Sequence, residues 1–141
     1  MYSLYSRSYV AFGKKQRILG VAAKNQQTTN IENTITGFKR FLGVRYEDPE
    51  IQAALKNPAF PFKITSVDGM AGYEANVFGE KQKMNAIQIS AMLLTKLKET
   101  TETAIRAKVH DCVISVSFYK IIHHSIEYFF FSEINVVGVW L

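Results

Sequence analysis

The apolar residues of this chain change their spacing at Asn85. Between residues 62 and 83 they alternate with polar residues, which is the pattern of strands with one buried face. Asp68-Gly69 and Gly79-Glu80 divide this stretch at two points and are typical of tight turns. The sequence therefore predicts a meander of three short strands ahead of Asn85.

A long helix is predicted from Asn85 to about Lys108. Asn85 is a favourable N-cap, and Gln88 stands three residues later, where its side chain can return a hydrogen bond to the cap residue. Apolar residues recur at helical spacing beyond the cap: Ile89, Leu93, Leu94, Leu97 and Ile105. Because no Gly or Pro interrupts this stretch, we expect it to be the best-ordered element of the chain.

Two shorter elements are predicted near the beginning of the chain. Residues 8–12 are rich in β-branched and aromatic side chains, and Gly13 with the two lysines after it offers a turn before residues 17–21. This pattern predicts a hairpin. Residues 22–27 favour a short helix, which the poor helix formers at residues 28–30 are expected to end.

Two further helices are predicted between residues 31 and 56. The first has four apolar residues at the spacing of one helical stripe: Ile31, Ile35, Phe38 and Leu42. Gly43 follows at the position of a helix-ending glycine. Asp48 before Pro49 is typical of a second helix start, because the Asp side chain can cap free N–H groups and Pro lacks one. We expect this second helix to reach about Lys56.

The last part of the chain differs in composition from the rest. Residues 112–116 form a continuous apolar run, which predicts a strand buried on both faces between parallel neighbours. After Tyr119, large apolar residues follow neither a helical nor a strand period. The formal charge also changes, from +7 over residues 1–108 to −2 over residues 109–141. We therefore predict that residues 120–141 are a divergent hydrophobic tail.

Length and composition favour one globular domain in a reducing compartment. The 141 residues include one cysteine, Cys112, which cannot form an internal disulfide, and no Asn-x-Ser/Thr acceptor. Neither a signal peptide nor a run of about 20 apolar residues is found. The expected setting is cytoplasmic or nuclear, with no membrane partner.

Several kinds of site are not predicted. Neither glycine-rich phosphate-loop motif occurs. His123 and His124 lie near Glu127, but a further zinc ligand has no obvious source, so no metal site is predicted. Cys112 lies in an apolar run, where burial would suppress the reactivity of its thiol. The basic residues between positions 14 and 45 lack interleaved aromatic residues, so no nucleic-acid partner is predicted.

Six segments occur in an order and spacing that identify a family. They are SYVAFG from Ser8, GVAAKNQQ from Gly20, NTITGFKRFLG from Asn33, DPEIQ from Asp48, ISAMLLTKLKET from Ile89 and DCVISV from Asp111. Together they resemble the heat shock protein 70 family over about residues 7–119. Three of the runs, VAAKNQQ, FKRF and AMLLTKLKET, are most similar to its large branch, the 110-kDa heat shock proteins that assist the smaller members.

The resemblance implies a mixed α+β chain of the α/β class, a fragment of the actin-like, ribonuclease-H-like ATPase fold. Residues 1–119 would be a partial nucleotide-binding domain, namely the outer subdomain of lobe I and the first core strand. In the family, the lysine of a Lys-Arg pair reaches the β/γ-phosphates and the attacking water. The resemblance therefore implies that Lys39 is catalytic and that Lys39 and Arg40 bind ATP or ADP with magnesium. Positioned positive charge suits phosphoryl transfer.

Other parts of the family's site are expected to be missing. Its Asp-Leu-Gly hairpin would lie upstream of this chain, and its second phosphate loop, adenosine pocket and substrate-binding region would lie beyond Leu141. Ser117 stands where the family has a proline, and no arginine follows Arg106. Each lost charge-assisted hydrogen bond removes about 1.5–3 kcal/mol. We therefore expect weak nucleotide binding and no ATP hydrolysis by this chain alone.

These observations leave three classes of function open. The first is a fragment of a 110-kDa-type molecular chaperone of the stress response, which in intact form binds ATP and acts as a nucleotide exchange factor. Its partners would be heat shock protein 70 chaperones and unfolded polypeptides. The alternative is a non-enzymatic module that docks on a partner chaperone. A basic nucleic-acid binder is a third and weaker hypothesis.

Overall fold

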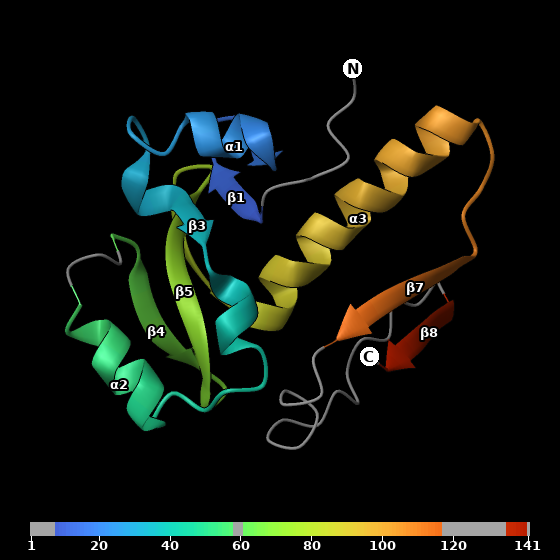
Figure 1. Ribbon diagram of the computed structural model, residues 1–141. Helices are drawn as coiled ribbons and strands as arrows, with labels where there is room; N and C mark the ends of the chain where they lie inside the picture. Colours follow the sequence, from blue (N-terminus) through green and yellow to red (C-terminus); the bar gives the residue numbers. More distant parts are fainter. Residues whose placement is uncertain (1–7, 58–60, 117–134, 141) are drawn as a thin grey trace. The chain divides into compact units, whose positions relative to one another are not determined.

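The computed structural model describes residues 8–57, 61–116 and 135–140 (Figure 1). Helices and strands both occur, and the sheets of the first unit are antiparallel, so the mixed α/β class is confirmed. The chain divides into two units, residues 1–93 and 94–141. Helix α3 (Ala86–Ile105) begins in the first unit and ends in the second.

The first sheet contains the predicted N-terminal hairpin. Strands β1 (Tyr9–Phe12) and β2 (Arg17–Leu19) pair antiparallel, and β3 (Thr34–Thr36) pairs antiparallel with the other edge of β1. The strand order is therefore β2-β1-β3. Helix α1 (Val21–Asn25) follows β2 closely, which confirms the short helix predicted in this region.

The helix predicted over residues 31–42 does not form. A 3-10 turn, η1 (Ile31–Asn33), precedes β3, and a second 3-10 turn, η2 (Phe38–Phe41), follows it. Between β3 and η2, Gly37 has a φ of +70°, which a continuous right-handed helix cannot contain. Ile31 is 46% exposed, so the supposed apolar stripe is not one buried face.

The predicted meander is confirmed. Strands β4 (Lys63–Val67), β5 (Met70–Val77) and β6 (Glu80–Asn85) pair antiparallel in that order. Asp68-Gly69 forms the first turn, and Phe78-Gly79 forms the second, one residue earlier than expected. One face of β5 is buried through four alternating residues: Ala71, Tyr73, Ala75 and Val77.

Helix α2 (Pro49–Leu55) begins where the sequence predicts, but its cap differs from the expectation. The Asp48 side chain makes no hydrogen bond to the first N–H groups of the helix. Instead, its Oδ2 accepts a hydrogen bond from the Arg45 N–H at 3.1 Å. The carboxylate therefore closes the turn before the helix rather than capping the helix itself.

The capping box of α3 is confirmed. The Asn85 N–H donates to Gln88 Oε1 at 2.9 Å, and the Gln88 N–H donates to Asn85 Oδ1 at 2.8 Å. Ile89 and Leu93 are buried in the first turns, whereas Ile105 near the end is 55% exposed. The apolar stripe is therefore buried only where the helix belongs to the first unit.

One apolar cluster joins the two sheets of the first unit. It receives residues from β1, β3, η2, α2, β5 and the start of α3. Its largest fully buried apolar and aromatic side chains are Tyr73, Phe38, Phe41, Ile35, Ile51, Ile89 and Val10. The local elements of this unit are therefore held by shared burial rather than by their own hydrogen bonds alone.

The second unit contains a parallel strand pair, β7 (Asp111–Val116) and β8 (Asn135–Trp140). The parallel neighbour expected for β7 is confirmed, but burial on both faces is wrong, since Val113 is 63% exposed and Cys112 is only half-buried. The sequence analysis finds no strand period after Tyr119. Residues Asn135–Trp140 nevertheless form β8, so this expectation is wrong for the last part of the tail. The rest of the tail up to residue 134 lies outside the described residues.

Candidate functional site

Lys39 and Arg40 lie next to each other on η2, between two buried aromatic side chains. Phe38 is 0% exposed and Phe41 is 1% exposed, so both rings point into the core. Lys39 and Arg40 are exposed. The left-handed Gly37 turns the chain out of β3 directly before η2. The two predicted site residues are thus presented together at the surface of a turn with a buried base.

The segment after η2 is attached to the beginning of β5. The Ala71 N–H donates to the Val44 carbonyl at 3.0 Å, and the Tyr46 N–H donates to the Gly69 carbonyl at 3.0 Å. These backbone hydrogen bonds fix the exit from η2 against the turn between β4 and β5. The orientation of η2 is therefore set from both sides, by the buried rings and by the sheet.

Arg40 has a partner that the sequence analysis did not anticipate. Its Nη2 lies 3.1 Å from Oε1 of Glu50 in the first turn of α2. The two side chains are 61% and 52% exposed. Ion pairs this exposed contribute only about 0–1 kcal/mol. Arg40 could therefore exchange Glu50 for a phosphate group at little cost to the fold.

Tyr73 lies beneath η2 and was also missed. Its ring stacks on Phe41 with centroids 5.9 Å apart and meets Phe62 edge-on at 5.4 Å. The hydroxyl is buried and has no hydrogen-bond partner among the described residues. Burial raises the pKa of the phenol far above its ordinary value, and the charge of Arg40 opposes this shift only in part. The sequence could have indicated this residue, because Tyr73 stands at a core-facing position of an alternating strand, where its hydroxyl needs a partner.

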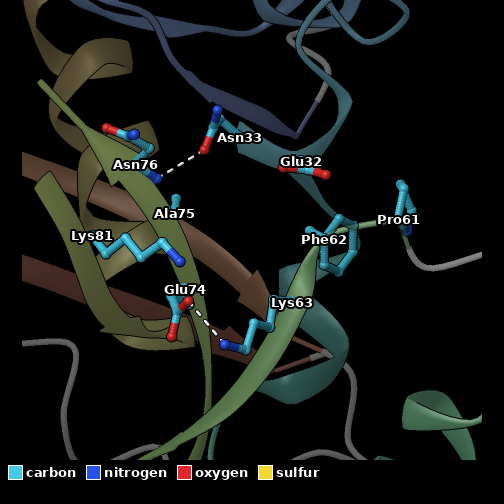
Figure 2. A pocket seen from close by; sticks show the side chains of 9 residues that line it. All are labelled: Glu32, Asn33, Pro61, Phe62, Lys63, Glu74, Ala75, Asn76 and Lys81. Carbon is cyan, nitrogen blue, oxygen red and sulfur yellow. Dashed lines mark hydrogen bonds and ion pairs between the residues drawn. The ribbon is translucent and has the colours of Figure 1, made fainter. Parts of the chain in front are cut away.

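A pocket of about 400 Å³ lies where β4 leaves part of β5 without a neighbour (Figure 2). The pairing of β4 with β5 stops at Lys63 and Glu74. Beyond this point, Oδ1 of Asn33 accepts a hydrogen bond from the Asn76 N–H at 2.8 Å. Turn η1 therefore covers the edge that β4 leaves, and the pocket lies between them.

A short ion pair forms one wall of this pocket. The Lys63 Nζ lies 2.9 Å from Oε1 of Glu74, and Figure 2 shows the Lys81 side chain extending toward the same carboxylate. The hydrogen bond from Lys63 lowers the pKa of Glu74; desolvation opposes this, and the charges of Lys63, Lys81 and Lys83 add to the lowering. Glu74 is therefore ionised near neutral pH, with Lys63 as its hydrogen-bonded partner.

The described residues include exposed cations but no cluster of three or more metal-ligating side chains. Within residues 8–57, 61–116 and 135–140, no cluster of three or more His, Cys, Asp or Glu side chains could hold an ion. His123, His124 and Glu127 lie outside these ranges. In the same described part, no helix is long and apolar enough to span a bilayer. Lys39 and Arg40 are two exposed cations next to each other, a charge arrangement that suits an anionic group.

The chain is similar to a well-defined set of proteins. The family model described as Hsp70 protein matches residues 5–120. A 97 kDa heat shock protein of Strongylocentrotus purpuratus is 45% identical over 113 residues, and heat shock 70 kDa protein 4 is 42% identical over 111 residues in Rattus norvegicus and 40% identical over 107 residues in Homo sapiens. These alignments cover 79%, 78% and 76% of this chain.

The same alignments cover only 12% to 13% of the length of these three relatives. The similarity therefore concerns one segment of much longer proteins. Because the family match includes every described element from β1 to β7, the fold of this segment is a fragment of the actin-like ATPase fold. This chain belongs to the Hsp70 family, and these three relatives there are large heat shock proteins of the 110-kDa branch.

Proposed function

We propose that this chain supplies part of the phosphate-binding lobe of a large Hsp70-type chaperone. In this role Lys39 contacts the β/γ-phosphates of ATP, and Arg40 binds beside it. The observation that supports the proposal best is η2 itself, which places two adjacent exposed cations on a turn with a buried base. Such preorganised positive charge stabilises phosphoryl transfer without moving a proton.

The nucleotide with magnesium supplies the transferable phosphoryl group, and the residues of this chain orient and neutralise it. Arg40 gives up its exposed pair with Glu50 when a phosphate approaches. Lys39, whose neighbours Phe38 and Phe41 are buried, keeps its backbone position. The role of the pair is therefore charge stabilisation rather than proton transfer.

The wider activity belongs to the longer protein in this proposal. Nucleotide exchange on heat shock protein 70 chaperones and contacts with unfolded polypeptides in the cytoplasm would require further domains. In this proposal the 141 residues alone bind ATP or ADP too weakly for catalysis, because two exposed cations supply only a part of the charge-assisted contacts that a nucleotide site needs, and each such contact is worth about 1.5–3 kcal/mol.

A chimaera tests the role of Lys39. Residues 5–120 replace the matching segment of human heat shock 70 kDa protein 4, and binding of a fluorescent ATP analogue is titrated. We expect the chimaera to bind the analogue and Lys39→Ala to weaken binding by about tenfold or more, since a charge-assisted contact is lost. Lys14→Ala, which removes an exposed lysine from the β1–β2 turn, serves as the matched control.

Two results would refute this role. Equal affinity of the chimaera with and without Lys39→Ala would mean that Lys39 does not contact the phosphates. An equal loss in the Lys14→Ala control would mean that net charge, rather than the position of Lys39, determines the affinity.

A further inference from the structure

The outer face of the meander gathers three lysines around one carboxylate. Along β5, Tyr73 points into the core, so by strand alternation Glu74 points to the opposite face. Glu74 is flanked by Lys63 on β4 and by Lys83 on β6, which are its direct cross-strand partners. Lys81 lies opposite Asn76, two pairs further along and therefore on the same face. The register of the three strands therefore brings Lys63, Lys81 and Lys83 close to Glu74.

The cluster retains unbalanced positive charge. Glu74 is already paired with Lys63 at 2.9 Å. Lys81 and Lys83 are exposed, and neither has an ion pair within 4.0 Å among the described residues. Glu32 lines the same pocket from η1, and the described part of the chain shows no ion pair between it and these lysines. Two ammonium groups are thus available to an anionic ligand.

The tip of the same hairpin presents an exposed aromatic ring. Phe78 is 59% exposed and has a φ of +55°, a backbone conformation that bulky residues rarely adopt. The turn is held by Asn76, whose Oδ1 accepts a hydrogen bond from the Gly79 N–H at 2.9 Å. Because Asn or Gly would suit this conformation better, the presence of Phe78 is not explained by the turn.

We propose that the outer face of β4–β5–β6 docks an acidic segment of a partner protein, with Lys81 and Lys83 pairing its carboxylates and Phe78 contacting an apolar side chain within it. Charge complementarity selects an acidic occupant. The face is separate from the proposed phosphate site, since η2 packs against the opposite face of β5 through Phe41 and Tyr73. The inference therefore goes beyond the proposed function and does not depend on it.

A peptide fits this face better than a nucleic acid does. The three strands contain three basic residues, of which Lys63 is already paired with Glu74, whereas a nucleic-acid surface neutralises several phosphates at once. The pocket of about 400 Å³ beside Lys63 and Lys81 also offers room for a side chain, with Phe62 in its wall. A partner of this chemistry would use the surface as a basic, partly apolar docking face.

The test measures binding of a fluorescent oligoglutamate peptide to the full chain by anisotropy. We expect saturable binding that Lys81→Gln with Lys83→Gln weakens by about tenfold, the equivalent of about 1.4 kcal/mol. The matched control is Lys14→Gln with Lys15→Gln, which removes the same charge from the exposed β1–β2 turn and should leave the affinity unchanged. Equal losses in the two double variants would overturn the proposal.

A second probe, the same peptide with leucine in place of two glutamates, tests Phe78. We expect it to bind more tightly than oligoglutamate and to lose that gain in Phe78→Asn, a variant that the positive φ favours and that should fold at least as well. No gain from leucine, or a gain that survives Phe78→Asn, would contradict the proposal. Tighter binding of duplex DNA or phosphatidylserine vesicles, lost in the Lys81/Lys83 variant, would assign the face to another class of ligand and overturn it.

Discussion

Replacing Gly72 with alanine is expected to destabilise the first unit by about 3 kcal/mol, at the upper end of overpacking costs. A Cβ at this position would lie 2.6 Å from Cγ2 of Val67, 2.7 Å from the Met84 carbonyl oxygen and 3.3 Å from Cα of Asn85. The Val67 methyl group could turn aside. The two Met84 and Asn85 backbone atoms could not move away without opening the pairing of β5 with β6.

Urea unfolding followed by far-ultraviolet circular dichroism measures this loss. Gly13→Ala is the matched control, because its Cβ would meet only the Gln16 carbonyl oxygen at 3.2 Å and Cδ1 of Ile18 at 3.8 Å. We expect that control to change the free energy of unfolding by less than about 1 kcal/mol. A Gly72→Ala variant as stable as Gly13→Ala would show that β5 and β6 are not packed as closely as the structure has them.

Truncating Phe41 to alanine should cost about 3–5 kcal/mol, the usual range for a buried aromatic side chain. Phe41 is 1% exposed, and its ring stacks on Tyr73. Since it forms the buried base of η2, its loss should also free Lys39 and Arg40 from their fixed positions. Thermal or urea unfolding gives the stability, and amide hydrogen exchange of residues 38–41 reports the local order.

Tyr73→Phe is the companion variant for this measurement. It keeps the ring contacts with Phe41 and Phe62 and removes a buried hydroxyl that has no partner in the described part of the chain. We expect no loss of stability, and a gain of up to about 1 kcal/mol, because an unsatisfied buried group is removed. If Tyr73→Phe were as destabilising as Phe41→Ala, the hydroxyl would have to make a contact that the described residues do not provide.

The elements that the sequence predicted well carry strong local signals. The helix that begins after Asn85 has a capping box in which Asn85 and Gln88 each accept a hydrogen bond from the other's backbone N–H. The meander has Gly at each of its turns, at residues 69 and 79, where φ is positive. In both cases a few neighbouring residues determine the structure, so distant partners are not needed to predict it.

The elements that were predicted wrongly depend on distant partners. Residues 34–36 are a strand because β1, about 25 residues earlier, offers a free edge, and the apolar spacing of residues 31–42 could not reveal this. Strand β8 likewise pairs with β7 across a long sequence separation. Val113 is exposed because its side chain lies on a face of β7 that the described part of the chain does not cover.

The residues of the candidate site also differ in whether the sequence alone could identify them. Lys39 and Arg40 were identified only through the resemblance, because an exposed lysine on a turn has no distinguishing pattern of its own. The Arg40 pair with Glu50 and the position of Tyr73 beneath η2 arise from tertiary packing between segments far apart in the sequence. The lysines around Glu74 could have been paired only once the register of the meander was known.

The release of inorganic phosphate from ATP by the purified chain tests most directly whether Lys39 and Arg40 form an ATPase site without the rest of the protein. At about 1 mM ATP with magnesium, the upper end of ordinary KM values, we expect no release above that of a buffer control. Lys39→Ala should then be indistinguishable from the unaltered chain. Magnesium-dependent release that disappears in Lys39→Ala and persists in Lys14→Ala would contradict this expectation and show that the 141 residues contain a complete site.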